Sequence, residues 1–174
     1  MTKDDIILLL DDKYTDLIKW LQNQPNDKWI TGPEGKWTMG QQALHLLQST
    51  VPLNNALSLP KFILRLKFGK ANRAVRPYEE VVKRYHEKLE KAKGKTYKGS
   101  ENMRIPSLKD KQFILDRLQV EQKKLQYKTK KLSNKQLNQL ILPHPLMGKM
   151  PLRELIMWSA YHVEHHTETM KSNY

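Results

Sequence analysis

The spacing of apolar residues in the first part of the chain limits most strongly how it can fold. Five apolar residues recur at intervals of four, four, three and four: Ile6, Leu10, Tyr14, Leu17 and Leu21. Residues at these intervals share one face of an α-helix, which predicts an amphipathic helix over about Asp4 to Gln22. No stretch of any length alternates apolar and polar residues as a strand does. The sequence therefore predicts an all-α protein.

Capping signals and helix breakers divide the middle of the chain. Thr38, with Gln41 three residues later, is a capping-box pattern, so a second helix is expected from Thr38 toward Pro52. A short helix is expected after Pro60 and a longer, strongly charged one over 77–93. Residues 94–106 are expected to form a loop.

The last third of the chain supplies two more long helices. Ser107, followed by Asp110, caps the first of them. Ser133 caps a short turn, and Pro151 suits the first turn of the final helix, where its missing N–H costs nothing. We therefore expect one domain over residues 1–174. It would be a bundle of four long helices with an elaborated connection between the second and the third.

Composition excludes several classes of site. The chain has no cysteine, so disulfides, zinc sites built from thiolates and a cysteine nucleophile are excluded. No stretch approaches the ~20 apolar residues that a membrane span requires. The apolar run Ile6 to Leu10 is too short for the core of a signal peptide. We expect a cytoplasmic protein.

The net charge of +13 is concentrated in the middle of the chain. Residues 61–131 contain 22 Lys and Arg against 8 Asp and Glu, whereas the remainder is nearly neutral. A basic region can bind nucleic acid, where Tyr78, Tyr85 and Tyr97 offer stacking surfaces. Residues 61–70 carry four apolar side chains among the charges, a pattern that could also meet an anionic membrane: Phe62, Ile63, Leu66 and Phe68. We favour a solvated surface whose apolar residues pack against the bundle.

Histidines form the most distinctive pattern. His162 and His166 are four apart on the last predicted helix and so share a face, where one metal ion could bind both. His45 lies on a polar face of the second predicted helix and could complete a three-histidine site. Gln41, Gln42, Gln48 and Glu164 are candidates to orient the rings. His165 is interpreted as a neighbour of the site, His86 as an exposed residue and His144 as a turn residue.

Three imidazoles favour zinc, nickel, copper or iron over calcium or magnesium. Three protein ligands leave room for water or a small-molecule substrate, as in catalytic sites. A metal can lower the pKa of such a water to near 7, which makes it a nucleophile at neutral pH.

Three motifs together resemble the DinB/YfiT-like superfamily of four-helix metalloproteins. They are Trp37-Thr38 before a helix that carries His45, His144-Pro145 with Gly148, and His162 with His165-His166 on the last helix. The resemblance covers nearly the whole chain. It implies an up-down-down-up bundle with a long crossover between helices two and three, and a homodimer. It also implies a divalent metal, zinc or nickel, on His45, His162 and His166.

Three classes of function remain open at this point. The first is a metal-dependent enzyme, for which the resemblance implies a hydrolase or a transferase that uses a low-molecular-weight thiol such as bacillithiol. The second is a non-catalytic protein that binds nucleic acid or an anionic surface. The third is a scaffold that the metal merely stabilises. The basic region at 61–131 matches no motif of the superfamily and does not indicate a substrate.

Overall fold

The computed structural model describes residues 1–92 and 103–174, and they are mostly helical. The predicted all-α class is therefore confirmed. The helices are α1 (Lys3–Gln22), α2 (Asn26–Ile30), α3 (Met39–Ser58), α4 (Lys61–Phe68), α5 (Tyr78–Lys91), α6 (Leu108–Lys131), α7 (Asn134–Gln139) and α8 (Leu152–Asn173). Of the loop expected over 94–106, residues 94–102 lie outside the described part.

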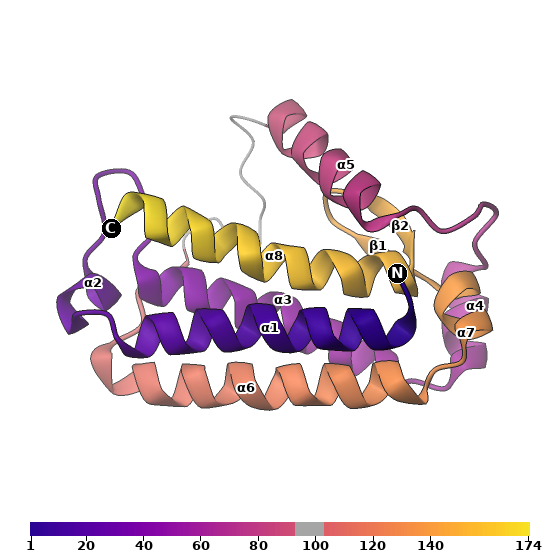
Figure 1. Ribbon diagram of the computed structural model, residues 1–174, viewed down its shortest axis with the longest axis horizontal. Helices are drawn as coiled ribbons and strands as arrows, with labels where there is room; N and C mark the ends of the chain where they lie inside the picture. The colour runs from indigo at the N-terminus through magenta and orange to yellow at the C-terminus, as the bar shows by residue number, and fades with distance from the viewer. Residues whose placement is uncertain (93–102) are drawn as a thin grey trace.

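Four long helices, α1, α3, α6 and α8, lie lengthwise beside one another (Figure 1). Helix α1 packs on α6 and α8, and α3 packs on the same two helices. The predicted apolar face of α1 is confirmed, since its five residues are fully buried. Within this core the hydroxyl groups of Tyr14 and Thr50 are 2.7 Å apart and join α1 to α3.

Side-chain caps begin the helices where the sequence predicts. The side chain of Thr38 accepts a hydrogen bond from the backbone N–H of Gln41, and the Gln41 side chain accepts one from the backbone of Thr38. Ser107 and Asp110 form the same kind of box at α6. Pro151, expected in the first turn of α8, is instead its N-cap, and the helix begins at Leu152.

Helix α3 continues through Pro52 to Ser58, beyond its expected end. A proline inside a helix leaves the carbonyl four residues earlier, here that of Gln48, without its N–H partner. Gln48 and Pro52 are both exposed, so water can replace the lost partner at low cost.

A small β-hairpin corrects the expectation of a chain without strands. Strands β1 (Ile141–His144) and β2 (Gly148–Pro151) pair antiparallel, with Ile141 opposite Pro151 and His144 opposite Gly148. Gly148 has a φ of 75°, which glycine adopts without strain. Each strand has four residues and a proline, too little for a recognisable alternation. The hairpin leads directly into α8.

Helix α4 also differs from expectation, because only part of its apolar surface packs against the bundle. Leu64 is fully buried, but Phe62 is 64% exposed and Leu66 is 82% exposed. Positions 62 and 66 lie on the face opposite Leu64, so one short helix cannot bury all three. Of the tyrosines offered for stacking, Tyr85 is buried and Tyr97 lies outside the described residues.

In the described ranges, every helix is either too short or too polar to traverse a lipid bilayer.

Candidate metal centre

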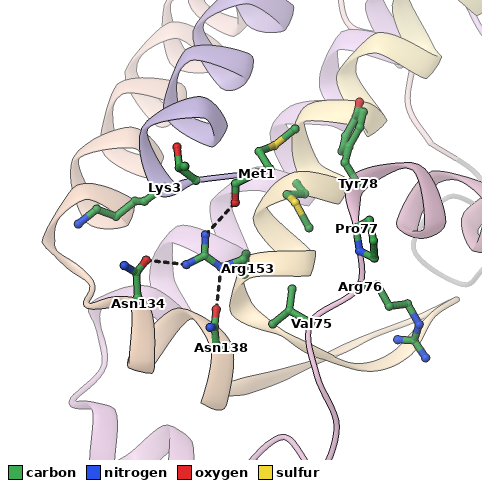
Figure 2. A pocket seen from close by; sticks show the side chains of 11 residues that line it. Met1, Lys3, Val75, Arg76, Pro77, Tyr78, Asn134, Asn138 and Arg153 are labelled. Atoms are coloured by element: carbon green, nitrogen blue, oxygen red, sulfur yellow. Dashed lines mark hydrogen bonds between the residues drawn. The ribbon is translucent and has the colours of Figure 1, made fainter.

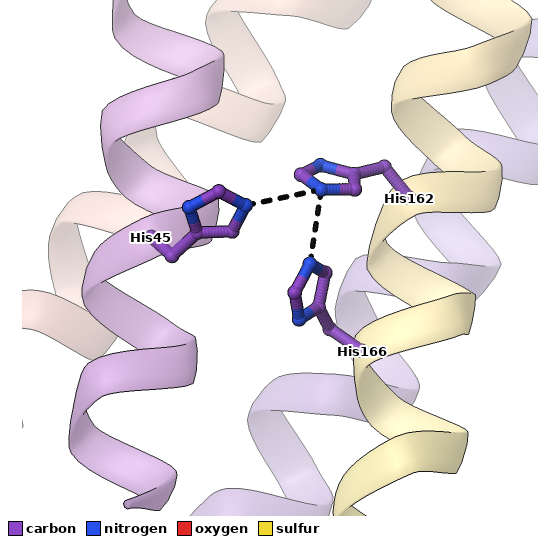
Figure 3. Close-up of side chains that lie close together, drawn as sticks. All are labelled: His45, His162 and His166. Carbon is purple, nitrogen blue, oxygen red and sulfur yellow. Dashed lines mark hydrogen bonds between the residues drawn. The ribbon is translucent and has the colours of Figure 1, made fainter. Parts of the chain in front are cut away.

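The three histidines predicted from the sequence come together between α3 and α8. His45 extends from α3, and His162 and His166 extend from successive turns of α8 toward it (Figure 3). The Nε2 atom of His162 is 3.2 Å from Nε2 of His45 and 3.0 Å from Nε2 of His166. One nitrogen from each ring lies within 4.8 Å of the other two. The rings thus present three nitrogens to one point.

These separations suit a tetrahedral transition-metal ion. With metal–nitrogen bonds of 2.0–2.1 Å, tetrahedral geometry places ligand nitrogens about 3.3 Å apart. The two short nitrogen–nitrogen distances are within a few tenths of an ångström of that value. The rings therefore need little movement to become ligands.

Hydrogen bonds on the far side of two rings determine where their protons lie. Nδ1 of His166 contacts Oε1 of Gln42, which can only accept, so this Nδ1 carries a proton. The Ser49 hydroxyl donates to the carbonyl of Leu46 at 2.8 Å and can therefore accept from Nδ1 of His162, 3.4 Å away. In the neutral rings both Nε2 atoms then carry lone pairs, which repel one another at 3.0 Å. A cation between them relieves that repulsion.

Burial keeps these imidazoles neutral. His162 is only 4% exposed, whereas His45 and His166 are half-buried. Desolvation lowers the pKa of His45 to about 4. Desolvation, reinforced by the neighbouring histidines, lowers the pKa of His162 and of His166 well below 6.5. At neutral pH all three rings offer lone pairs, as metal ligands must.

Aromatic side chains fix the ring planes. Trp158 stacks on His162 with ring centroids 4.5 Å apart, and Trp37 lies parallel to His166 at 6.4 Å. Trp37 also contacts His45, at 5.1 Å between centroids. The Trp37 that precedes α3 therefore touches both rings that remain partly exposed.

Comparison with known protein families identifies the family of this chain. The family model of the DinB superfamily matches residues 9–170, nearly the entire chain. The protein belongs to the DinB superfamily. Neither the curated proteins nor the solved structures compared with it contain a match.

The three motifs of the superfamily resemblance fall at distinct places around the DinB bundle. Trp37 and Thr38 precede α3, and the Thr38 cap sets where His45 falls on that helix. His144 ends β1, and its Nδ1 accepts the backbone N–H groups of Leu146 and Met147 at 3.1 and 3.0 Å. His144 thus holds the hairpin turn, and it does not belong to the three-histidine cluster.

Of the four residues expected to orient the histidine rings, only Gln42 contacts one of them. Gln42 bonds His166, as predicted for this group. Gln41 instead caps α3 and donates to the carbonyl of Met103. Gln48 is exposed, and Glu164 pairs with Lys13 at 3.0 Å. The assignments of Gln41 and Gln48 were wrong because they came from residue type and helix, without knowledge of which side of α3 faces α8. Glu164 was the weakest candidate, since helical spacing puts it off the face of α8 that carries His162 and His166.

Ser49 is the contact that sequence reasoning missed. It was recognised as part of the polar face of α3 but not as a partner of His162. The signal that could have found it is its position four residues after His45, one turn further along the same side.

His165 lies beside the cluster and faces a different group of rings. Its centroid is 5.8 Å from Tyr85 and 5.9 Å from His86, both on α5. His86 is exposed, as predicted, and its Nε2 also lies 2.5 Å from the hydroxyl of Tyr161. These contacts connect α5 to α8 next to the three histidines.

Proposed function

We propose that this DinB-superfamily protein binds a divalent transition metal, zinc or nickel, through His45, His162 and His166, and is a metal-dependent hydrolase of a small molecule. One observation carries the proposal: the Nε2 atoms of His162 and His166 lie 3.0 Å apart, and Nε2 of His45 lies 3.2 Å from that of His162. The donor set of three nitrogens fits zinc or nickel.

The bound metal would supply Lewis acidity to a water or a substrate oxygen at the coordination position that the protein leaves open. Neighbouring side chains orient the imidazole rings and determine which ring nitrogens carry protons. Gln42 and Ser49 hold the protons on the far nitrogens, and the Trp158 ring fixes the plane of His162. Because His45 is partly exposed, a small molecule can approach from its side.

The proposal also includes the domain extent, the helix topology, the oligomeric state and the location that the sequence predicted. The contacts among α1, α3, α6 and α8 support a single domain over residues 1–174 with the up-down-down-up topology and the long crossover between its second and third long helices. The homodimer and the cytoplasmic location stay predictions.

The first experiment is elemental analysis of the purified protein beside two variants. His45→Ala removes the ligand from α3, and His86→Ala is a matched control outside the cluster. We expect about one zinc or nickel per chain in the wild type and in His86→Ala, and a large loss in His45→Ala. Absence of stoichiometric metal from the wild type, or metal retained by His45→Ala, contradicts the proposed ligands.

A second experiment tests the reaction. The metal-loaded protein is screened against hydrolysable small molecules with and without an added low-molecular-weight thiol. Hydrolysis without thiol that His45→Ala abolishes supports the proposal. Turnover that depends on the thiol identifies the alternative transferase, since the chain has no cysteine of its own. Metal binding without turnover in either screen would contradict both enzyme proposals and favour a scaffold that the metal only stabilises.

A further inference from the structure

An open cavity lies at the N-terminal end of α8, whereas the histidines of the proposed metal centre lie near the middle of that helix. It has a volume of about 600 Å³, within the usual range for small-molecule sites. Arg153, which lines it, precedes His162 by nine residues on the same helix. That spacing is about 14 Å along the axis and half a turn around it, so the cavity is separate from the histidines.

The polar feature of this cavity is the Arg153 guanidinium (Figure 2). Its Nε donates to Oδ1 of Asn138 at 2.7 Å, and one terminal nitrogen donates to Oδ1 of Asn134 at 2.6 Å. The other terminal nitrogen donates to the carbonyl of Met1 at 3.3 Å. These bonds occupy three of its five N–H groups and leave one on each terminal nitrogen. All three acceptors are neutral.

Arg153 is only 8% exposed, and no carboxylate within residues 1–92 and 103–174 pairs with it. The adjacent Glu154 is already engaged: it accepts from the guanidinium groups of Arg73 and Arg76 and from the backbone N–H of Arg76. Desolvation alone lowers the pKa of Arg153, with no compensating carboxylate. A buried cation without a counter-ion is costly, and an anion in the cavity would offset that cost.

Two other cationic side chains at the rim make their hydrogen bonds away from Arg153. Arg76 pairs with Glu154 and Glu80, and the Lys3 ammonium donates to backbone carbonyls at the end of α6. Arg153 is therefore the buried cationic side chain of this lining, and one carboxylate is enough to balance its charge. The walls include Val75 and Pro77, which are partly exposed and present apolar surface.

From this arrangement we infer that the cavity binds a small monocarboxylate with an apolar body, its carboxylate on Arg153 and its hydrocarbon part against Val75 and Pro77. The two free N–H groups on separate terminal nitrogens suit the two oxygens of a carboxylate. Asn134 and Asn138 position the guanidinium from α7. The site acts independently of the proposed metal centre.

The test is a titration of the full-length protein with acetate, butanoate and hexanoate, with hexanamide as the neutral analogue and inorganic phosphate as the dianion. Binding is followed by the NMR signals of the Asn134 and Asn138 side-chain amides. We expect affinity to rise with chain length, up to roughly four-fold for each buried methylene. Hexanamide should bind at least about ten-fold more weakly than hexanoate.

Asn134→Asp separates ligand binding from a purely structural role of Arg153. The change is nearly isosteric and gives Arg153 an internal carboxylate, so the fold is kept while the need for a bound anion disappears. We expect hexanoate affinity to fall at least about ten-fold. Asn55→Asp, with the same change of charge at an exposed position of α3, should bind hexanoate as the wild type does.

Three results would overturn the inference. The first is that none of the carboxylates shifts the Asn134 and Asn138 signals. The second is hexanoate binding that survives Asn134→Asp. The third is phosphate binding more tightly than every carboxylate, which would assign the cavity to a different class of anion.

Discussion

Gln42→Leu tests whether the hydrogen bond behind His166 prepares that ring as a metal ligand. Gln42 is 6% exposed, and its Oε1 contacts Nδ1 of His166. Leucine has a similar volume but cannot accept a hydrogen bond. Without the acceptor, the proton on His166 is free to move to Nε2, the atom that faces the other two rings. Metal binding must then displace it, so affinity falls.

The expected size follows from linkage. Loss of such a partner typically reduces metal affinity 10- to 100-fold. At a free metal concentration 100 times the wild-type dissociation constant, binding stabilises the wild type by about 2.7 kcal/mol; the variant keeps between roughly 0.4 and 1.4 kcal/mol. For a chain of 174 residues each kcal/mol raises Tm by about 2–4 °C. The wild type should gain about 5–11 °C and the variant roughly 1–6 °C.

The assay is thermal unfolding of each protein with and without zinc or nickel, beside direct calorimetric titration. Each protein is compared with its own metal-free form, so any cost of the substitution to the apo fold cancels. Gln48→Leu is the control, since Gln48 is exposed on the same helix; it should gain as much as the wild type. If Gln42→Leu shows the wild-type rise and affinity, the reasoning about the His166 proton is refuted.

Three further predictions concern stability. Gly40→Ala should lower the free energy of unfolding by about 1–3 kcal/mol in urea titrations, because the new Cβ would lie 2.7 Å from the Trp29 carbonyl oxygen; an unchanged midpoint contradicts this. Tyr14→Phe should cost about 1 kcal/mol through its lost bond to Thr50, and a neutral result would show that the bond is dispensable. Burial lowers the pKa of His144 to about 4. Between about pH 6.5 and pH 4 this histidine is therefore protonated in the unfolded chain and neutral in the folded chain. As the pH falls through that range, the free energy of unfolding should decrease by up to about 3 kcal/mol. His144→Asn, which keeps an acceptor for the turn, should reduce that acid slope in melts between pH 7 and 4, and an identical slope would argue against it.

Local signals predicted most of the helices because each depends on neighbouring residues. The apolar stripe of α1 and the Thr38 cap of α3 are properties of short segments, and both are confirmed. The errors have a different origin. Helix α3 passes Pro52 because that side of it faces water, and α4 leaves Phe62 and Leu66 exposed because its neighbours cover only the side of Leu64. Those outcomes depend on which elements pack together, which no short segment reveals.

The same dependence on packing explains why the sequence identified the three histidines but not most of the residues that contact their rings. At 100° per residue, Gln42 and Ser49 lie about 60° and 40° to one side of His45, whereas Gln41 and Gln48 lie about 40° and 60° to the other. The sequence shows both pairs as equal members of one polar face. Only the packing of α8 along the first side distinguishes them: Gln42 meets His166 and Ser49 meets His162. Any residue of α3 that orients the proposed ligands should therefore lie on that side of the helix, and a substitution of the exposed Gln48 should leave metal affinity unchanged.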